Sequence, residues 1–442
     1  MSRSLSFRRL ALVVPLLGAA GAASALSGRW ARAEAPAARL DESKVLELDI
    51  AFFEARVARD SFAARDHAQL ARLHLQRAPV GGTENEDLKQ AEAHARRSLA
   101  LRTAHNGETL QVLASALMGQ HRFAEARKLA ERLLAMDSTS RTARSLLGES
   151  ELELGDYTEA TRTFGTLLTV RGELGVAPRF ARWEEIRGRP TDSRRLLRDA
   201  LHQAAKRHGM PRSQLAWFHW RLGDLALRQG QPDEAERELR AGIALVPEDH
   251  RLLDGMARVA LARGRWREAI DLGERAIART LDPVTLGLLS VSWEMLGDSA
   301  RSAEYEREMD NAVARQPNGL NRQWAMLRLD RGRDVPQVLA KAREEMRARR
   351  DIYAWDLLAW ALYRSGKIDE AGDASARALA MHTRDASLYF HAGMIAAAAG
   401  DTALARRRLQ EALEINPRWH PTHPAEARAV LNPPVRSSDG VD

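Results

Sequence analysis

One glycine recurs along this chain at a nearly constant interval, and this recurrence limits the possible fold more than any other feature. Most steps are close to about 34 residues, and the apolar residues between them follow the spacing of two successive helices. A fixed period of this length predicts a stack of similar helical units. The recurring residues are Gly155, Gly188, Gly230, Gly264, Gly297, Gly332, Gly366 and Gly400, with His121 in the same place one period earlier.

The clearest unit is the stretch 212–247. Gly230 is expected to end its first helix in the left-handed conformation, which costs a residue with a Cβ more. Pro232 suits the first turn of the second helix, where its missing N–H is not needed. Gly223 and Ala235 are small enough to lie where the two helices cross closely. The stretch therefore predicts a tightly packed helical hairpin.

The same small residues return in the other units. In the first helices they are Ala114, Gly148, Gly223, Ala257, Ala359 and Gly393, and in the second helices Ala126, Ala160, Ala235, Ala269, Ala371 and Ala405. This pattern resembles the tetratricopeptide repeat (TPR), a helix–turn–helix unit that buries its apolar stripe only by stacking on neighbours. The resemblance implies an all-α protein, a right-handed α-solenoid of stacked hairpins with about nine to ten repeats.

The N-terminus has the pattern of a secretory signal peptide. A basic start containing Arg8 and Arg9 precedes an apolar run at 10–23, and small residues at Ala25 and Ala33 offer two cleavage sites. We expect 1–33 to be a signal peptide and short linker, and the protein to be periplasmic or secreted. The run is shorter than the roughly 20 residues of a membrane span, so no integral span is expected after cleavage. General secretory and twin-arginine export both stay open.

The charge balance argues against a nucleic-acid partner. The chain has 67 Lys and Arg and 60 Asp and Glu, a formal charge of +7, and cleavage after Ala25 or Ala33 lowers this to +4 or +2. The remaining charges alternate in sign on helix surfaces, as is typical of solvated faces. The chain has no cysteine, which excludes disulfides and a lipid on an N-terminal cysteine.

The order of segments follows from these signals. A lengthened step near 209–211 is the best position for a kink or boundary between two arrays. We expect an N-terminal cap and a first, insertion-bearing repeat at 40–105, TPR arrays at 106–208 and 212–419, a capping helix at 420–432 and a disordered tail at 433–442.

Catalytic motifs are missing from the sequence. It contains no HExxH, GxxxxGK[ST] or GxSxG pattern. His420 and His423, with His391 nearby in the last repeat, have the spacing of metal ligands, but histidines beside prolines in a cap are more typical of polar surface. We therefore expect no catalytic residue, no cofactor and no metal.

The TPR resemblance also implies a binding groove, because the first helix of each hairpin lines the concave side. The positions carried over are Trp217, Trp220, Asp224, Arg251, Asp254, Arg258, Arg322, Met326, Tyr353, Asp356, Trp360, Tyr363, Phe390 and Met394. Aromatic and arginine side chains often dominate interfaces, yet Trp217, Trp220, Tyr353 and Trp360 fit a packing role equally well. Trp324 lies at a core offset and is expected to be structural.

The sequence thus favours a non-enzymatic scaffold or adaptor of the bacterial envelope that binds a protein or peptide in its groove. The segment 353–401 is similar to exported bacterial TPR proteins. Two alternatives stay open. One is a cofactor-free enzyme with a pocket joining Arg322, Asp356 and His391, and the other is a helical-repeat reader of nucleic acid.

Overall fold

The computed structural model describes residues 42–79, 84–315 and 320–433, and all regular structure within these ranges is helical. The prediction of an all-α helical-repeat solenoid is confirmed for this part of the chain. The expected signal segment 1–33 lies outside the described residues. So does the expected tail 433–442, apart from its first residue.

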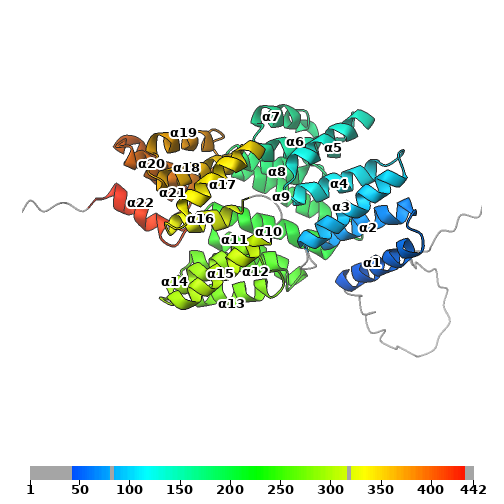
Figure 1. Ribbon diagram of the computed structural model, residues 1–442, viewed down its shortest axis with the longest axis horizontal. Coiled ribbons are helices and arrows are strands. Elements are labelled where there is room, and N and C mark those ends of the chain that lie inside the picture. Colours follow the sequence, from blue (N-terminus) through cyan, green and yellow to red (C-terminus); the bar gives the residue numbers. More distant parts are fainter. Residues whose placement is uncertain (1–41, 80–83, 316–319, 434–442) are drawn as a thin grey trace, which may run out of the picture. The chain divides into compact units, whose positions relative to one another are not determined.

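Ten hairpins follow one another in the described residues (Figure 1). Their first helices are α2 (Ala64–Arg77), α4 (Gly107–Gly119), α6 (Arg141–Leu154), α8 (Ala177–Ile186), α10 (Arg212–Arg228), α12 (His250–Ala262), α14 (Pro283–Met295), α16 (Arg322–Asp330), α18 (Ile352–Arg364) and α20 (Ala386–Ala398). Their second helices are α3 (Glu84–Leu101), α5 (Phe123–Met136), α7 (Tyr157–Gly165), α9 (Pro190–Ala205), α11 (Pro232–Leu245), α13 (Trp266–Ile277), α15 (Ser299–Ala314), α17 (Val335–Ala348), α19 (Ile368–Ala378) and α21 (Thr402–Ile415). The remaining elements are α1 (Glu42–Arg59) before the hairpins, the 3-10 helix η1 (Leu168–Val170) and α22 (His423–Leu431) after them.

The recurrent glycine lies in the turn of its hairpin, as predicted. All eight of these glycines have φ between +66° and +85°, and His121 has φ +57° at the matching place. A left-handed residue here ends the first helix and lets the chain reverse into the second.

The small residues also lie where the pattern placed them. A Cβ added to Gly223 would lie 2.7 Å from the side chain of Leu239, which comes from the second helix of the same hairpin. The same relation holds for Gly393, whose added Cβ would lie 2.6 Å from Leu409. Glycine therefore sets how closely the two helices of these hairpins approach.

Stacking packs the hairpins against one another along the array. From α10 to α20 each first helix packs against the next first helix, and each second helix packs against the hairpin that follows. The largest group of buried apolar residues extends from Leu152 to Ala427. None of the described helices is both long and apolar enough to cross a lipid bilayer.

A set of contacts between distant hairpins was not predicted. The backbone N–H of Arg350 donates to the carbonyl of Leu154 at 2.9 Å, and that of Ile352 donates to the Tyr157 hydroxyl at 2.7 Å. These bonds join the turn between α6 and α7 to the loop between α17 and α18. We call this contact, together with the two similar contacts described next, the inter-turn seam.

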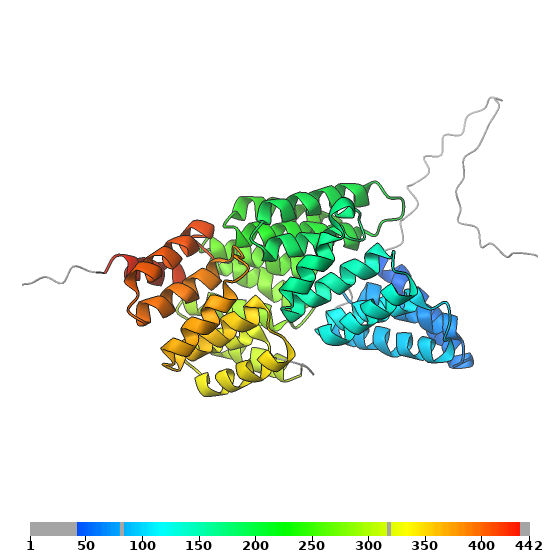
Figure 2. The same cartoon turned by 90° about the horizontal axis from the view of Figure 1, so that it is seen from above.

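The seam continues in register along the next two hairpins. The Thr383 hydroxyl donates to the carbonyl of Ile186, and the Asn416 side-chain nitrogen donates to the carbonyl of Leu227 at 2.9 Å. Each step moves one hairpin along both partners, so the seam repeats with the period of the stack. The segments it joins lie side by side in Figures 1 and 2.

Candidate binding groove

A cavity of about 350 Å³ lies among the first helices. Its lining comes mainly from α10, α12, α14, α16 and α20, together with the segment 416–423 that leads into α22. First helices thus provide most of the lining of this cavity.

One side of the cavity is apolar. Helix α14 contributes Val284, Gly287 and Val291, which lie on one helical face, and α10 and α12 add Leu227 and Leu261. These α14 residues are not among the predicted groove positions. They occupy the same repeat positions as Arg251, Asp254 and Arg258 one repeat earlier, so the repeat register could have found them.

Charged groups near the cavity belong to a ladder of ion pairs that runs along consecutive first helices. Arg182 of α8 pairs with Glu153 of α6 at 3.3 Å and with Glu185 at 3.2 Å. Glu185 in turn pairs with Arg221 of α10 at 3.1 Å and also with Arg228. Buried charges are tolerated when each has partners of opposite sign, as these have.

The ladder continues through α12 to α14. Asp224 pairs with Arg228 at 2.6 Å and lies 3.9 Å from Arg258, which pairs with Asp254 at 2.8 Å. The Thr285 hydroxyl of α14 donates to Asp254 at 3.0 Å. The ladder holds arginines and carboxylates in equal number, so its charges balance one another, and it reaches the cavity through Asp224, Arg228 and Arg258.

Neighbouring arginines determine which ladder carboxylates stay ionised. Burial opposes ionisation of Asp224, but Arg228, Arg221 and Arg258 outweigh it and lower the pKa of Asp224 to about 2. Burial raises the pKa of Asp254, because Arg258 only partly compensates for it. Asp224 is therefore firmly charged, in contrast to Asp254.

A second network joins the last three hairpins. Arg322 donates to one carboxylate oxygen of Asp356 at 2.6 Å, and His391 Nδ1 lies 2.8 Å from the other. Burial opposes ionisation of Asp356, but His391 and Arg322 together lower its pKa. The Tyr353 ring connects both networks, because the Arg322 and Arg182 guanidiniums lie 5.1 and 5.7 Å from its centroid.

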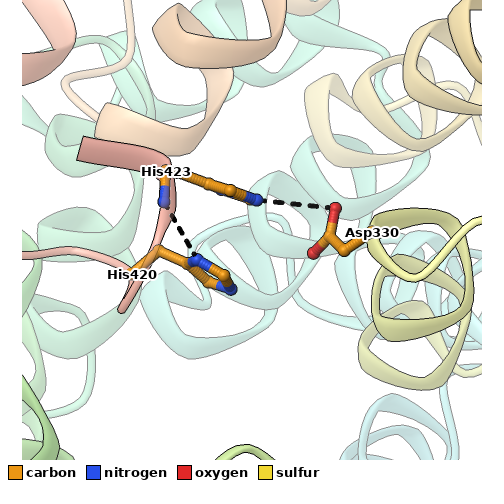
Figure 3. Close-up of side chains that lie close together, drawn as sticks. All are labelled: Asp330, His420 and His423. Carbon is orange, nitrogen blue, oxygen red and sulfur yellow. Dashed lines mark hydrogen bonds and ion pairs between the residues drawn. The ribbon is translucent and has the colours of Figure 1, made fainter. Parts of the chain in front are cut away.

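Three side chains form a separate group at the end of the cavity, which we call the C-terminal cluster. It consists of Asp330, the last residue of α16, His420 and His423, the first residue of α22 (Figure 3). His423 Nε2 lies 3.6 Å from Asp330 Oδ1, and Trp360 Nε1 donates to the same oxygen at 2.8 Å. The two imidazole rings are stacked with centroids 3.7 Å apart.

The cluster has strong electrostatic coupling. Burial, followed by repulsion from His423, lowers the pKa of His420 to about 3, so this imidazole is neutral near pH 7. Burial opposes ionisation of Asp330, but His423 and His420 outweigh it and lower its pKa. The cluster therefore presents one carboxylate and one neutral imidazole beside His423.

Comparison with known families decides what these hairpins are. Three segments, 112–165, 221–284 and 357–418, match the family model described as "Tetratricopeptide repeat". The chain is a tetratricopeptide repeat protein. The matched segments run from within α10 to the end of α13 and from within α18 to the end of α21, and they include cavity residues of α10, α12 and α20 of this TPR protein. No curated protein matches the chain.

Solved structures show a likeness limited to the fold. The APC/C hetero-tetramer Cut9–Hcn1 is 14% identical, with 89% of this chain and 97% of that chain covered and a TM-score of 0.34. The human IFIT1 dimer with PPP-AAAA is 15% identical, with 85% and 95% covered and a TM-score of 0.43. Yeast Tom70 is 13% identical, with 88% and 92% covered and a TM-score of 0.33.

The polar residues predicted for the groove lie in or beside the cavity of this TPR protein. Asp224, Arg258 and Arg322 line it, together with the predicted Met326. The remaining polar ones are Asp254 and Asp356, which are buried in the two networks, and Arg251, which pairs with Asp249 at 2.6 Å.

None of the predicted aromatic residues is among those that line the cavity. Trp220 packs against a cluster of buried apolar residues, and the guanidiniums of Arg221 and Arg251 lie 5.7 and 5.8 Å from its ring centroid. Trp360 and Phe390 belong to the core, with 2% and 0% of their surface exposed. The half-buried members at the core edge are Trp217, Tyr353, Tyr363 and Met394. Trp324 is buried, as expected.

In the last repeat the inward position is shifted by one residue. The register carried over from the TPR resemblance selected Phe390, but His391 contacts Asp356 and lines the cavity. Phe390 instead stacks on His423 at 4.3 Å, inside the core. Leu288 and Gln323 hold the position of His391 in two earlier repeats and also line the cavity, so this shift is not confined to the last repeat.

Proposed function

We propose that this TPR protein is a non-enzymatic scaffold that binds an extended peptide segment of a partner protein in the cavity on its first helices. One observation carries the proposal: a single cavity joins the apolar face of α14 to ion pairs that balance one another. A peptide offers both apolar side chains and backbone polar groups, and so matches both sides. A polyanion would need an excess of positive charge, which the ladder does not provide.

The enzyme hypothesis required Arg322, Asp356 and His391 to meet, and they do meet. However, the two carboxylate oxygens of Asp356 are used by Arg322 and His391, so this carboxylate serves an ion-pair network. Structural networks of this kind also shift pKa values. We therefore favour binding over catalysis.

Photo-crosslinking from the groove tests the scaffold proposal. A photoreactive phenylalanine analogue at Val291, which lines the cavity, is compared with the same analogue at Leu296, which is exposed just after α14 and is absent from the lining. We expect a discrete partner adduct only from position 291, lost when Val284→Glu is added to the same chain. Equal adducts from both positions, or an adduct that survives Val284→Glu, would contradict the proposal.

We also propose that the scaffold acts in the bacterial envelope, which the basic and apolar N-terminus supports. Mass spectrometry of the protein from a periplasmic or secreted fraction is expected to find a chain that begins at Leu26 or Glu34. A cytoplasmic chain that retains its first 25 residues would contradict this location and leave the groove proposal untouched.

A further inference from the structure

The C-terminal cluster brings together three groups that ligate metals. One ligand atom each from Asp330, His420 and His423 lies within 4.8 Å of the other two. They come from the end of α16, from the loop before α22 and from the first residue of α22. We propose that these three side chains bind one divalent transition-metal ion, of which Zn²⁺ is the best fit, and that the ion ties the C-terminal cap to α16.

The spacing of the groups suits a shared ion better than a direct bond. His423 Nε2 and Asp330 Oδ1 are 3.6 Å apart, beyond the range of a proper hydrogen bond. Two ligands of a tetrahedral zinc ion with bonds of about 2.0–2.1 Å lie about 3.4 Å apart. A small contraction would therefore place both atoms on one ion, without any movement of the helices that carry them.

The donor set points to the class of metal. Two imidazoles with one carboxylate are typical of zinc and its neighbours, whereas Ca²⁺ and Mg²⁺ prefer sites made of oxygen alone. Each imidazole can offer a ring nitrogen lone pair to the ion in its neutral form.

Outer groups already orient the ligands, as they do in established metal sites. Trp360 Nε1 donates to Asp330 at 2.8 Å, and the Phe390 ring stacks on His423 at 4.3 Å. The Thr422 hydroxyl lies 3.3 Å from His420 Nδ1 and can accept a hydrogen bond from the Nδ1–H group once Nε2 binds the ion. In return His420 gives up its weak contacts, at 3.3 and 3.4 Å, with the backbone N–H groups of Thr422 and His423.

A fourth coordination position faces the cavity, because all three ligands belong to its lining. His391 stands next to this position, with its ring centroid 6.1 Å from that of His423. Its Nδ1 is held by Asp356 at 2.8 Å, which directs Nε2 away from that carboxylate. Water or His391 can complete the coordination, so the site needs no group from a partner. It therefore does not depend on the proposed peptide function.

The test uses the full chain, stripped with a chelator and titrated with Zn²⁺ by calorimetry and with Co²⁺ by visible absorption. We expect one ion per chain and intense Co²⁺ bands of tetrahedral type. His423→Ala and Asp330→Asn are each expected to weaken binding at least tenfold and to abolish the bands. His208→Ala, at an exposed histidine outside the cluster, is expected to bind as the unmodified chain does.

A second control separates this site from the other histidine group in the structure. His94 contacts His67 in the first hairpin, and His94→Gln removes one imidazole there. Circular dichroism at 25 °C confirms that each variant is folded before titration. Failure of the folded, unmodified chain to bind one ion overturns the proposal. It is also overturned if binding is lost in His94→Gln, or kept in both His423→Ala and Asp330→Asn.

Discussion

At the scale of single residues, two helical glycines differ in the space around them. Gly223 lies in α10 where an added Cβ would be 2.7 Å from Leu239, whereas Gly372 lies in α19 with nothing within 4 Å of an added Cβ. Both are helical, so alanine would improve the helix propensity of each by about 1 kcal/mol. Only their surroundings differ.

Gly223→Ala is therefore expected to destabilise the protein, and Gly372→Ala to stabilise it slightly. Overpacking costs about 1–3 kcal/mol, which exceeds the gain in propensity at Gly223. At Gly372 the gain of about 0.5–1 kcal/mol stands alone. Urea denaturation followed by circular dichroism measures both. A midpoint for Gly223→Ala at or above that of the unmodified chain would show that α10 and α11 can move apart freely.

Single residues also show what could and could not be predicted from the sequence. The turn glycines and crossing residues were predictable because each follows from the backbone or volume of one hairpin. The inner face of the last repeat was not, because the repeat pattern alone does not fix which of Phe390 and His391 α20 turns toward the cavity. Asp330 was missed for a similar reason, since its partners His420 and His423 lie outside the repeat pattern.

At the scale of one element, the first hairpin contains a histidine group that the repeat pattern does not require. His67 Nδ1 lies 2.9 Å from His94 Nδ1, so one of the two nitrogens must be unprotonated. His74 stacks on His94 with centroids 5.8 Å apart, and its Nδ1 lies 2.8 Å from Asp87. Burial, with repulsion from His67 and His74, lowers the pKa of His94 to about 4.

This hairpin is expected to lose stability in mild acid. His94 would titrate near pH 6.5 when unfolded and near 4 when folded, so the unfolded state alone gains a proton as the pH falls between these values. The loss reaches about 2–3 kcal/mol at pH 4. Urea midpoints of the first unfolding transition between pH 7.5 and 4.5 should fall for the unmodified chain and for His208→Gln. His94→Gln should flatten the curve, and an unchanged slope would exclude His94 as the cause.

At the scale of the whole array, the ion-pair ladder and the inter-turn seam connect different parts of the chain. The ladder joins each first helix to the next, from α6 to α14, and so supports the local stack. The seam joins hairpins that are distant in sequence, as between Leu154 and Arg350. Sequence could not predict the seam, because it depends on small rotations that accumulate over several repeats.

Some turn glycines also allow the close backbone approach at the seam, in addition to the left-handed backbone of the turn. Substitutions can separate these two roles. A Cβ on Gly155 or Gly188 would overlap the backbone of Arg350 or His382, whereas nothing lies within 4 Å of one on Gly366 or Gly400. All four have φ between +73° and +85°, so alanine costs each about 1–2 kcal/mol in backbone strain. We expect Gly155→Ala and Gly188→Ala to cost at least about 2 kcal/mol more than Gly366→Ala and Gly400→Ala, because rigid backbone must move apart.

Thermal unfolding measures the difference, and hydrogen exchange at 349–352 should accelerate only in Gly155→Ala. Equal costs at all four positions would mean that the seam contributes nothing to stability, and that the stack is held by neighbouring hairpins alone.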